Sequence, residues 1–427
     1  MNKIEFYKET NFKQTPIGEL PRDWEANKLG SICKFKRGFS YRSNQITNNQ
    51  TPIRFITIND IEKEGGLKRG AEKIYIKDPS EINSEFLVDN GDVLIANTDM
   101  AKGFIIGAPI LIKNLSEKCA YSMDLTKLIF DKTKICGDFL FYYLTHPQMR
   151  KKMKSSAQGT NVLHLNHELI SDFLIPLPPV EEQRAVAWVL SVVDLAIQRT
   201  DMVIAKTERL KKGLMQTLLT RGIGHKEFKD TEIGKIPKTW QIVSISDVCK
   251  QRNEIVQPPV NNKEPLVGLE HIASGETRLR NYSQSADVKS AKFRFHRGDI
   301  LYGKLRPYLD KAVIADLDGI CSTDLLVLTP KENILNEFLI YVLHSHDFIK
   351  HAIATTTGTN HPRTSWSAIS KFKFGLPDFL EQQKIAKILS SVSVKLELER
   401  NRKAKLERIK QGLMDLLLTG KVRVKVN

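Results

Sequence analysis

Apolar and small residues alternate at spacings of four and three over two long stretches of the chain. Between 181 and 219, where the only proline or glycine is Gly213, they fall at positions 186, 190, 193, 197, 200, 204, 207, 214 and 218. A four-three alternation is the seam of a coiled coil. The pattern predicts a helix about 58 Å long at 1.5 Å per residue, and a second such helix from about 379 to 419.

The ends of both predicted helices carry recognisable signals. Pro179 precedes the first helix, and Glu182 lies in its first turn, where the helix dipole favours a carboxylate. Asp378 and Glu381 form a capping pattern at the start of the second helix. Glycines follow both helices, at 222 and 420, and are typical C-terminal stops.

Shorter apolar runs precede each long helix. They predict strands at 55–58, 92–96 and 125–130 and a helix at 138–153. The expected fold class is therefore α/β (α+β), with two tandem α/β domains that are each followed by a long helix.

The chain contains an internal duplication. The segment 12–21 recurs as 228–237, and each copy leads to a tryptophan and a cysteine, Trp24 and Cys33 or Trp240 and Cys249. Of the 44 positions in 177–220, 19 are identical to their counterparts in 376–419. We therefore divide the chain into a first globular domain, a first long helix, a second globular domain and a second long helix, at 1–176, 177–222, 223–375 and 376–427.

The offset between the two copies changes from 216 to 207 and then to 199, mostly because the segment from about 34 to 120 differs in length from its counterpart. Loops tolerate insertions and carry recognition, so two unlike targets are expected. The short connection at 221–228 would let the helices form an antiparallel coiled coil with pseudo-two-fold symmetry. DNA has such symmetry in its backbone. The alternative is that each helix packs on its own domain.

Charge narrows the class of partner. Lys and Arg number 65 and Asp and Glu 49, a net charge of +16, which favours DNA, RNA or an anionic membrane surface. The longest apolar run is about nine residues, too short for a membrane span of about 20. The first residues are charged where a signal peptide is apolar, so we expect a cytoplasmic protein without a membrane partner.

Motifs that would indicate catalysis are incomplete. The segment 298–304 fits G-x-x-x-x-G-K, but Leu305 stands where a phosphate-binding loop needs Ser or Thr, and the intervening residues favour a strand. The five cysteines form no CxxC pair. Histidines around 164–168 and 344–347 lack the spacing of a metal hydrolase, and we expect them at the surface or facing DNA. No catalytic centre, metal or bound cofactor is therefore expected.

Polar, basic and aromatic residues cluster in segments that could contact DNA. Arg and Lys can pair with guanine, Asn and Gln with adenine, and all of them with phosphate. The candidates are Lys36, Arg37, Tyr41, Arg42, Lys102, Gln158 and Asn161 in the first domain, and Lys304, Arg306, Tyr308, Asn360, Arg363 and Thr364 in the second.

The combination of motifs resembles the specificity subunits of type I restriction–modification systems (HsdS) over essentially the whole chain. The resemblance is carried by segments 17–24 and 298–308, by 175–179 and 376–377 with the Glu-Gln pairs that follow, and by the Lys-x-Gly-Leu-Met helix ends. The first copy departs from the pattern, because segment 96–103 replaces the Gly-Lys-Leu-Arg-Pro-Tyr of the second.

The resemblance implies two target-recognition domains that each read half of a split site in double-stranded DNA, and helices that measure the spacer. Two modification subunits, which use S-adenosylmethionine, would dock on the conserved parts, and restriction subunits that use ATP and Mg would join them. The implied partner-binding residues are Glu182, Gln183, Gly213, Leu214, Met215, Glu381, Gln382, Gly412, Leu413 and Met414.

The leading hypothesis is thus a non-catalytic DNA-specificity subunit. Two alternatives stay open. One is a coiled-coil interaction scaffold that does not bind DNA, and the other is a stand-alone DNA enzyme with a divergent site.

Overall fold

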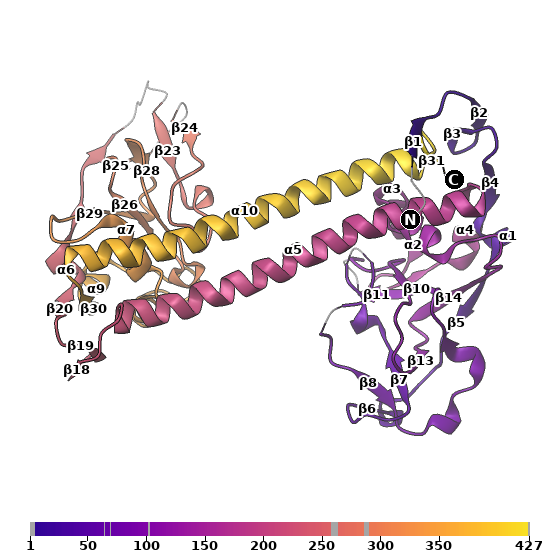
Figure 1. Cartoon of the computed structure of the whole chain (residues 1–427), viewed down its shortest axis with the longest axis horizontal. Coiled ribbons are helices and arrows are strands. Elements are labelled where there is room, and N and C mark those ends of the chain that lie inside the picture. Colours follow the sequence, from indigo (N-terminus) through magenta and orange to yellow (C-terminus); the bar gives the residue numbers. More distant parts are fainter. Residues whose placement is uncertain are drawn as a thin grey trace. The chain divides into compact units, whose positions relative to one another are not determined.

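The chain folds into two compact units. The computed structural model describes residues 5–63, 65–68, 70–100, 103–257, 264–285 and 290–425. Unit 1 comprises residues 1–199 and 402–427, and unit 2 comprises residues 200–401. The division passes through both long helices, α5 (Val180–Arg221) and α10 (Phe379–Leu417), so each unit contains one part of each helix (Figure 1).

The described residues of unit 1 form two main sheets. The antiparallel four-stranded sheet has the order β12-β10-β14-β5, and the five-stranded sheet has the order β6-β8-β7-β13-β9, with β7 and β13 parallel. The strands of these two sheets are β5 (Cys33–Arg37), β6 (Ile46–Thr47), β7 (Ile53–Ile56), β8 (Ile74–Ile76), β9 (Leu87–Val88), β10 (Val93–Ala96), β12 (Pro109–Leu111), β13 (Lys118–Tyr121) and β14 (Leu125–Phe130).

Smaller strand groups surround these sheets. A three-stranded sheet has the order β11-β16-β15, and three two-stranded pairs join β1 to β31, β2 to β3 and β4 to β17. Their bounds are β1 (Glu5–Lys8), β2 (Phe12–Thr15), β3 (Gly18–Pro21), β4 (Glu25–Lys28), β11 (Thr98–Met100), β15 (Ala157–Gln158), β16 (Val162–Leu165), β17 (Leu174–Leu177) and β31 (Val422–Lys425).

The single helix predicted at 138–153 is wrong, because the chain forms two helices there. The short helices of unit 1 are α1 (Leu29–Ile32), α2 (Gly137–Thr145), α3 (Pro147–Ser155) and α4 (His167–Ser171). Proline disfavours helical backbone in the residue before it, and His146 accordingly has the extended angles φ −56° and ψ 132°. Pro147 then occupies the first turn of α3, where its missing N–H costs nothing.

Unit 2 repeats the same plan. Its sheets have the orders β21-β29-β26-β27 and β22-β25-β28-β23-β24, with β23 and β28 parallel. One difference is that β6 extends the five-stranded sheet of unit 1 beside β8, whereas β22 extends the sheet of unit 2 beside β25, at the opposite edge. The strands are β18 (Phe228–Thr231), β19 (Gly234–Pro237), β20 (Gln241–Ser244), β21 (Cys249–Arg252), β22 (Ile255–Val256), β23 (Pro265–Val267), β24 (Ser283–Gln284), β25 (Lys292–Phe295), β26 (Ile300–Gly303), β27 (Ala312–Ile314), β28 (Gly319–Cys321), β29 (Leu325–Pro330) and β30 (Lys373–Leu376).

Several local predictions are confirmed. Strands β7, β10 and β14 lie where the first domain was expected to have them, although the run at 55–58 ends as a strand at Ile56. The G-x-x-x-x-G-K segment contains β26 and forms no loop around an anion. The short helices of unit 2 are α6 (Ile245–Val248), α7 (Asn336–Leu343), α8 (His346–Ala354) and α9 (Trp366–Ile369).

The predicted seam packs the two long helices on each other within each unit. In unit 1, Val186 and Leu190 of α5 are buried with Met414 and Leu417 of α10, together with Phe139 of α2. In unit 2, Leu218 of α5 shares a buried cluster with Ile385 and Leu389 of α10 and with the domain core. Each helix therefore packs both on its partner helix and on a domain, which combines the two alternatives that the sequence left open.

A buried glutamate anchors the start of α5. Trp24 donates its indole N–H to Glu182 at 3.1 Å, and Arg423 of β31 donates to the same carboxylate from Nε at 3.0 Å and from Nη2 at 2.7 Å. Arg423 also pairs with Asp23 at 2.7 Å and with Glu9 at 2.9 Å. The carboxylate thus ties the first domain to the segment that follows α10.

Glu381 has the equivalent role at the start of α10. Trp240 donates its indole N–H to this carboxylate at 2.9 Å, the main-chain N–H of Ile223 donates at 2.8 Å, and the His225 ring lies at 2.9 Å. Ile223 and His225 follow α5, so each glutamate joins the tryptophan of its own repeat to the end of the other helix.

The two glycine stops lie at these same junctions. Gly222 has φ +64° and Gly420 has φ +71°. A Cβ atom on Gly420 would lie 2.5 Å from Cγ of Pro21 and 3.2 Å from the Trp24 ring. Both left-handed backbone and lack of space therefore require glycine there.

Replacing Arg423 should destabilise unit 1 strongly. In Arg423→Met the carboxylates of Glu182, Asp23 and Glu9 lose their common cation, and removing one partner of a buried ion pair costs roughly 3–5 kcal/mol. Urea unfolding at pH 7 measures the loss, and Lys425→Met, on an exposed position of the same strand, is the control. Equal stability of the two variants would contradict an anchoring role for Arg423.

Glycine-to-alanine substitutions should have opposite effects at two positions of the α10 end. Gly420→Ala should lower the unfolding free energy by at least about 1–2 kcal/mol, because left-handed backbone is strained for alanine. Gly412→Ala, within the helix and with open space at its Cβ position, should raise it by up to about 1 kcal/mol. Thermal and urea unfolding of both variants test this, and a stabilising Gly420→Ala would refute the packing at this junction.

Candidate nucleic-acid interface

Two segments of the first domain that are distant in sequence meet in one three-stranded sheet. Strand β11 pairs with β16, and β16 pairs with β15. The main-chain N–H of Leu165 donates to the carbonyl of Asn97 at 2.9 Å. Gln158 on β15 and Asn161 in the turn after it are both exposed beside this sheet. Two of the predicted DNA-contacting segments are thereby adjacent.

Asn97, Arg37 and His167 are among the residues that line a hollow of about 440 Å³. In the amide orientation that satisfies its neighbours, Asn97 donates to Nε2 of His167 at 2.7 Å and accepts from Nη2 of Arg37 at 3.1 Å. The Thr126 hydroxyl lies 3.2 Å from the same ring nitrogen. Burial, followed by the charge of Arg37, lowers the pKa of His167.

These contacts hold the side chains that line the hollow in place. A neutral His167 accepts at Nε2 and stacks on Phe35 at 5.4 Å between ring centroids, so the ring is held in place. Arg37 is exposed, whereas Asn97, which accepts a hydrogen bond from it, is only 3% exposed. The Arg37 guanidinium is therefore accessible to solvent while a buried side chain holds it in position. Arg is the side chain that most often reads guanine edges, through paired hydrogen bonds.

The other candidates of the first domain lie away from this hollow. Neighbouring residues of a strand face opposite sides, and Lys36 of β5 pairs with Glu85 at 2.8 Å instead of joining Arg37. Tyr41 packs edge-on against Phe55, and burial raises its pKa. Arg42 is exposed beside a short turn, and Lys102 lies outside the described residues.

The sequence reasoning missed three lysines and one methionine near this surface. Lys151, Lys152 and Lys154 are exposed on α3, which ends just before β15, and none pairs with a described carboxylate. Such lysines suit phosphate contacts. Met100 is 70% exposed on β11, where an apolar side chain could touch a thymine methyl group. The run of lysines in 147–155 was the available sequence signal.

The second domain also joins its predicted segments. The main-chain N–H of Arg306 donates to the carbonyl of Pro362 at 2.8 Å, and that of Thr364 donates to the carbonyl of Lys304 at 3.0 Å. Arg363 pairs with Asp324 at 3.1 Å, and Asn360 is exposed in the turn before it. Thr364 does not fit the prediction of a surface contact, because it is only 3% exposed.

A strained turn presents Tyr308. Arg306 and Asp310 have φ +52° and +50°, on either side of the short 3-10 helix η6 (Pro307–Leu309), and left-handed backbone costs roughly 1–2 kcal/mol per residue. The Asp310 carboxylate is held by Nδ1 of His344 at 2.6 Å. His344 is buried, so the expectation that it lies at the surface is wrong. Tyr308 is 54% exposed, and strain of this kind is common at binding sites.

The two domains share one main-chain frame around these residues. Asn97 donates its N–H to the carbonyl of Asp124 at 2.7 Å, and Lys304 donates to that of Asp324 at 3.0 Å. The carbonyls of Asn97 and Lys304 accept from equivalent positions of the following segments. Asn97 and Lys304 are therefore structural equivalents, with an amide in one domain and an ammonium in the other.

Four residues that were expected to bind partners are buried. Glu182 and Glu381 form the junctions described above. Gln183 accepts from the N–H of Cys136 at 2.8 Å and donates to the carbonyl of Pro178 at 2.8 Å, and Gln382 makes the equivalent bonds. The polar atoms of both pairs are used inside their units, so these residues do not offer a docking surface.

The Gly-Leu-Met segments divide between core and surface. Met414 is buried, whereas Leu214, Met215 and Leu413 are partly buried. Gly213 and Gly412 are exposed, and a Cβ at either position would meet nothing within 4 Å.

An apolar stripe on α5 was not anticipated from the sequence. Trp188, Val192 and Leu195 are each 46% exposed, and their spacing of four and three places them on one face, beside the buried seam. A contiguous exposed stripe of this kind is typical of an interaction surface.

Two further properties bear on function. Within the described ranges, no three His, Cys, Asp or Glu side chains are grouped so that they could hold a metal ion. No helix among these residues is both long and apolar enough to cross a membrane.

Comparison with known proteins gives a consistent result. Residues 21–206 and 237–408 match the family described as type I restriction modification DNA specificity domain. The chain is 29% identical over 99% of its length, and 98% of the relative's, to the type I restriction enzyme MjaVIII specificity subunit of Methanocaldococcus jannaschii. It is 30% identical, over 99% of each chain, to the putative MjaX specificity subunit of the same organism.

A solved structure shares the fold. The type I restriction-modification system S subunit from M. genitalium superposes with a TM-score of 0.59 over 92% of this chain and 96% of its own, at 15% identity. The duplicated domains, the long helices and the two matched segments agree with one another, and the chain belongs to the family of type I restriction–modification DNA specificity subunits.

Proposed function

We propose that this chain reads a bipartite, asymmetric site in double-stranded DNA, with one half-site for each domain. The observation that carries the proposal is the shared frame around Asn97 and Lys304, which holds different side chains at equivalent positions. Because the main-chain arrangement is the same, both domains would lie on DNA in the same way. Different side chains at the equivalent position would then contact different bases.

Charge supports DNA as the ligand. The net charge of +16 and the exposed lysines of α3 suit the phosphate backbone. Each phosphate neutralised contributes about −0.9 to the slope of log affinity against log salt concentration. The alternative function, a scaffold that does not bind DNA, predicts no such salt-sensitive affinity.

Catalysis is assigned to partner subunits in this proposal. Two titratable groups of the first hollow, His167 and Arg37, are hydrogen-bonded to Asn97. We propose that the chain is not itself an enzyme. Two modification subunits would use S-adenosylmethionine, and restriction subunits would use ATP and Mg. The curated relatives are named specificity subunits of type I restriction enzymes, which supports such partners.

The surface of the long helices is the proposed docking site. Trp188, Val192 and Leu195 form an apolar stripe, and Gly213 and Gly412 leave bare backbone at positions where alanine would fit better. Glycine in an exposed helix costs about 1 kcal/mol relative to alanine. Close approach of a partner at these positions explains why the chain accepts that cost.

Substitutions at the two equivalent positions should change separate halves of the recognition site. With the cognate methyltransferase subunit co-expressed, Asn97→Ala should relax or alter one half-site of the N6-methyladenine motif, and Lys304→Ala the other. Losing one paired contact to a base costs about 1–3 kcal/mol, or roughly 5- to 150-fold in discrimination.

Genome-wide mapping of N6-methyladenine reads out both half-sites at once. Lys36→Ala, on the opposite face of β5, is the matched control and should leave the motif unchanged. If Asn97→Ala alters both half-sites, or if neither variant alters the motif, the division of reading between the domains is wrong.

Alanine at the exposed helix glycines should separate stability from assembly. Gly213→Ala and Gly412→Ala should each raise the unfolding free energy of the free chain by up to about 1 kcal/mol, yet weaken its complex with the methyltransferase subunit. Affinity measured on the immobilised chain tests this, with Lys206→Ala as an exposed control on the same helix. If both variants bind the methyltransferase subunit as tightly as the unchanged chain does, these glycines are not part of the docking surface.

A further inference from the structure

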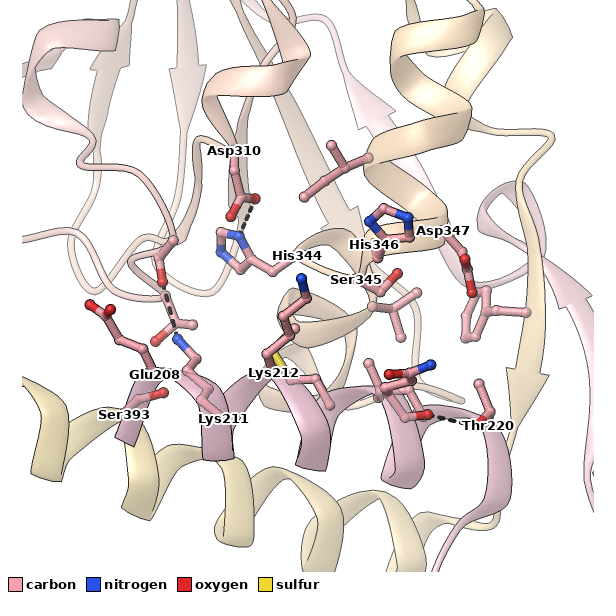
Figure 2. Close-up of a pocket in the computed structure, with 18 of the residues that line it drawn as sticks. Glu208, Lys211, Lys212, Thr220, Asp310, His344, Ser345, His346, Asp347 and Ser393 are labelled. Carbon is pink, nitrogen blue, oxygen red and sulfur yellow. Dashed lines mark hydrogen bonds and ion pairs between the residues drawn. The ribbon is translucent and has the colours of Figure 1, made fainter. Parts of the chain in front are cut away.

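Unit 2 contains a cavity that the proposed DNA reading does not use. It has a volume of about 780 Å³ and lies between α5, α10 and the loops of the second domain (Figure 2). Met215, Leu219 and Phe372 contribute apolar surface, while Lys211 and Lys212 of α5 contribute charge. Cavities of 300–1,000 Å³ with an apolar lining and a few placed polar groups are typical ligand sites.

In unit 1, carboxylates of the chain itself lie at the positions equivalent to part of this lining. There, Lys410 of α10 pairs with Asp194 of α5 at 2.7 Å, and the Tyr142 hydroxyl donates to the same carboxylate at 2.8 Å. A second contact joins Nε2 of His146 to Asp415 at 2.8 Å. Within unit 1, Asp194 and Asp415 thus supply carboxylates that contact Lys410 and His146.

Neither carboxylate is present in unit 2. At the offset of 199, Lys211 corresponds to Lys410 and Tyr341 to Tyr142, but Ser393 stands where Asp194 would be. The Tyr341 hydroxyl lies 3.3 Å from the Ser393 hydroxyl, and Lys211 donates only to the carbonyl of Gly275 at 3.3 Å. Burial lowers the pKa of Lys211, although the charges of the nearby Glu276 and Asp310 carboxylates act in the opposite direction.

The second contact is also missing. Gln216 stands at the position of Asp415, and Ser345 at that of His146. Lys212 replaces Gln411 and has no ion pair with a described residue. Figure 2 shows the Lys212 side chain rising from α5 toward the part of the cavity where His344 and Ser345 lie.

The acidic groups of the lining are mostly committed elsewhere. Glu208 pairs with Arg400 at 2.8 Å, Asp310 binds His344 at 2.6 Å, and Glu397 pairs with Arg280. Glu276 lies 3.5 Å from Arg400. Asp347 is exposed at the start of α8. Among the described residues, neither Lys211 nor Lys212 forms an ion pair with a carboxylate, and Lys211 is partly buried.

We propose that this cavity binds an organic anion, whose phosphate or carboxylate group meets Lys211 and Lys212 and whose apolar body lies on Met215, Leu219 and Phe372. The ligand supplies the negative charge that Asp194 and Asp415 supply in unit 1. Its size is bounded by the cavity at about that of a nucleotide. The proposal does not depend on DNA reading.

Calorimetric titration of the full chain tests this with three probes. Adenosine monophosphate and 2-naphthoate carry a phosphate or a carboxylate on an aromatic body, and adenosine is the uncharged counterpart. At least one of the two anions should bind with a stoichiometry of one at millimolar or lower concentration, and adenosine should bind at least tenfold more weakly.

The decisive variant restores the arrangement of unit 1. Ser393→Asp should pair with Lys211, raise the melting temperature and weaken anion binding at least tenfold. Ser391→Asp adds the same charge at an exposed position of the same helix and should leave binding unchanged. Failure of both anions to bind, or binding that Ser393→Asp does not weaken, overturns the proposal. The second result would place the anion elsewhere, such as on the DNA-facing surface.

Discussion

A buried carboxylate at the start of each long helix is the contact on which the rest of the structure depends. Glu182 binds the Trp24 indole and Arg423, and Glu381 binds the Trp240 indole and the segment after α5. Each glutamate therefore holds together a domain, the start of one helix and the end of the other. A charge in such a place is tolerated only because every side of it is hydrogen-bonded. This requirement explains why Trp, Glu and a glycine stop recur together in both copies.

Duplication supplies a frame that can stay constant while its side chains change. The hydrogen bonds around Asn97 and Lys304 involve main-chain atoms, so they do not depend on which side chain is present. Under the proposed function, a different side chain at such a position would alter recognition, while these main-chain hydrogen bonds stay the same. The offset between the two copies changes along the chain because loops of different length connect the strands. The four-stranded sheet has the same strand arrangement in both copies.

The two units nevertheless differ in how their helices are neutralised. Lys410 has a carboxylate partner in unit 1, whereas its counterpart Lys211 in unit 2 faces a serine and a cavity. Partial burial makes an ammonium without an ion-pair partner less favourable than one in water. In unit 1 the lysine pairs with a carboxylate of the chain itself, whereas in unit 2 the proposed ligand would supply the acid group.

The sequence alone determined the duplication, the two long helices with their seam and their glycine stops, and the strands predicted at 55–58, 92–96 and 125–130, of which the first lies two residues earlier in the structure. These follow from periodicity and local backbone preference, which act over a few residues. Tertiary structure decided which candidates meet. Strand alternation separated Lys36 from Arg37, pairing of β11 with β16 brought Asn97 beside His167, and burial turned Glu182 and Gln183 from expected docking residues into internal anchors. Local sequence cannot reveal these outcomes, because they depend on contacts between segments far apart in the chain.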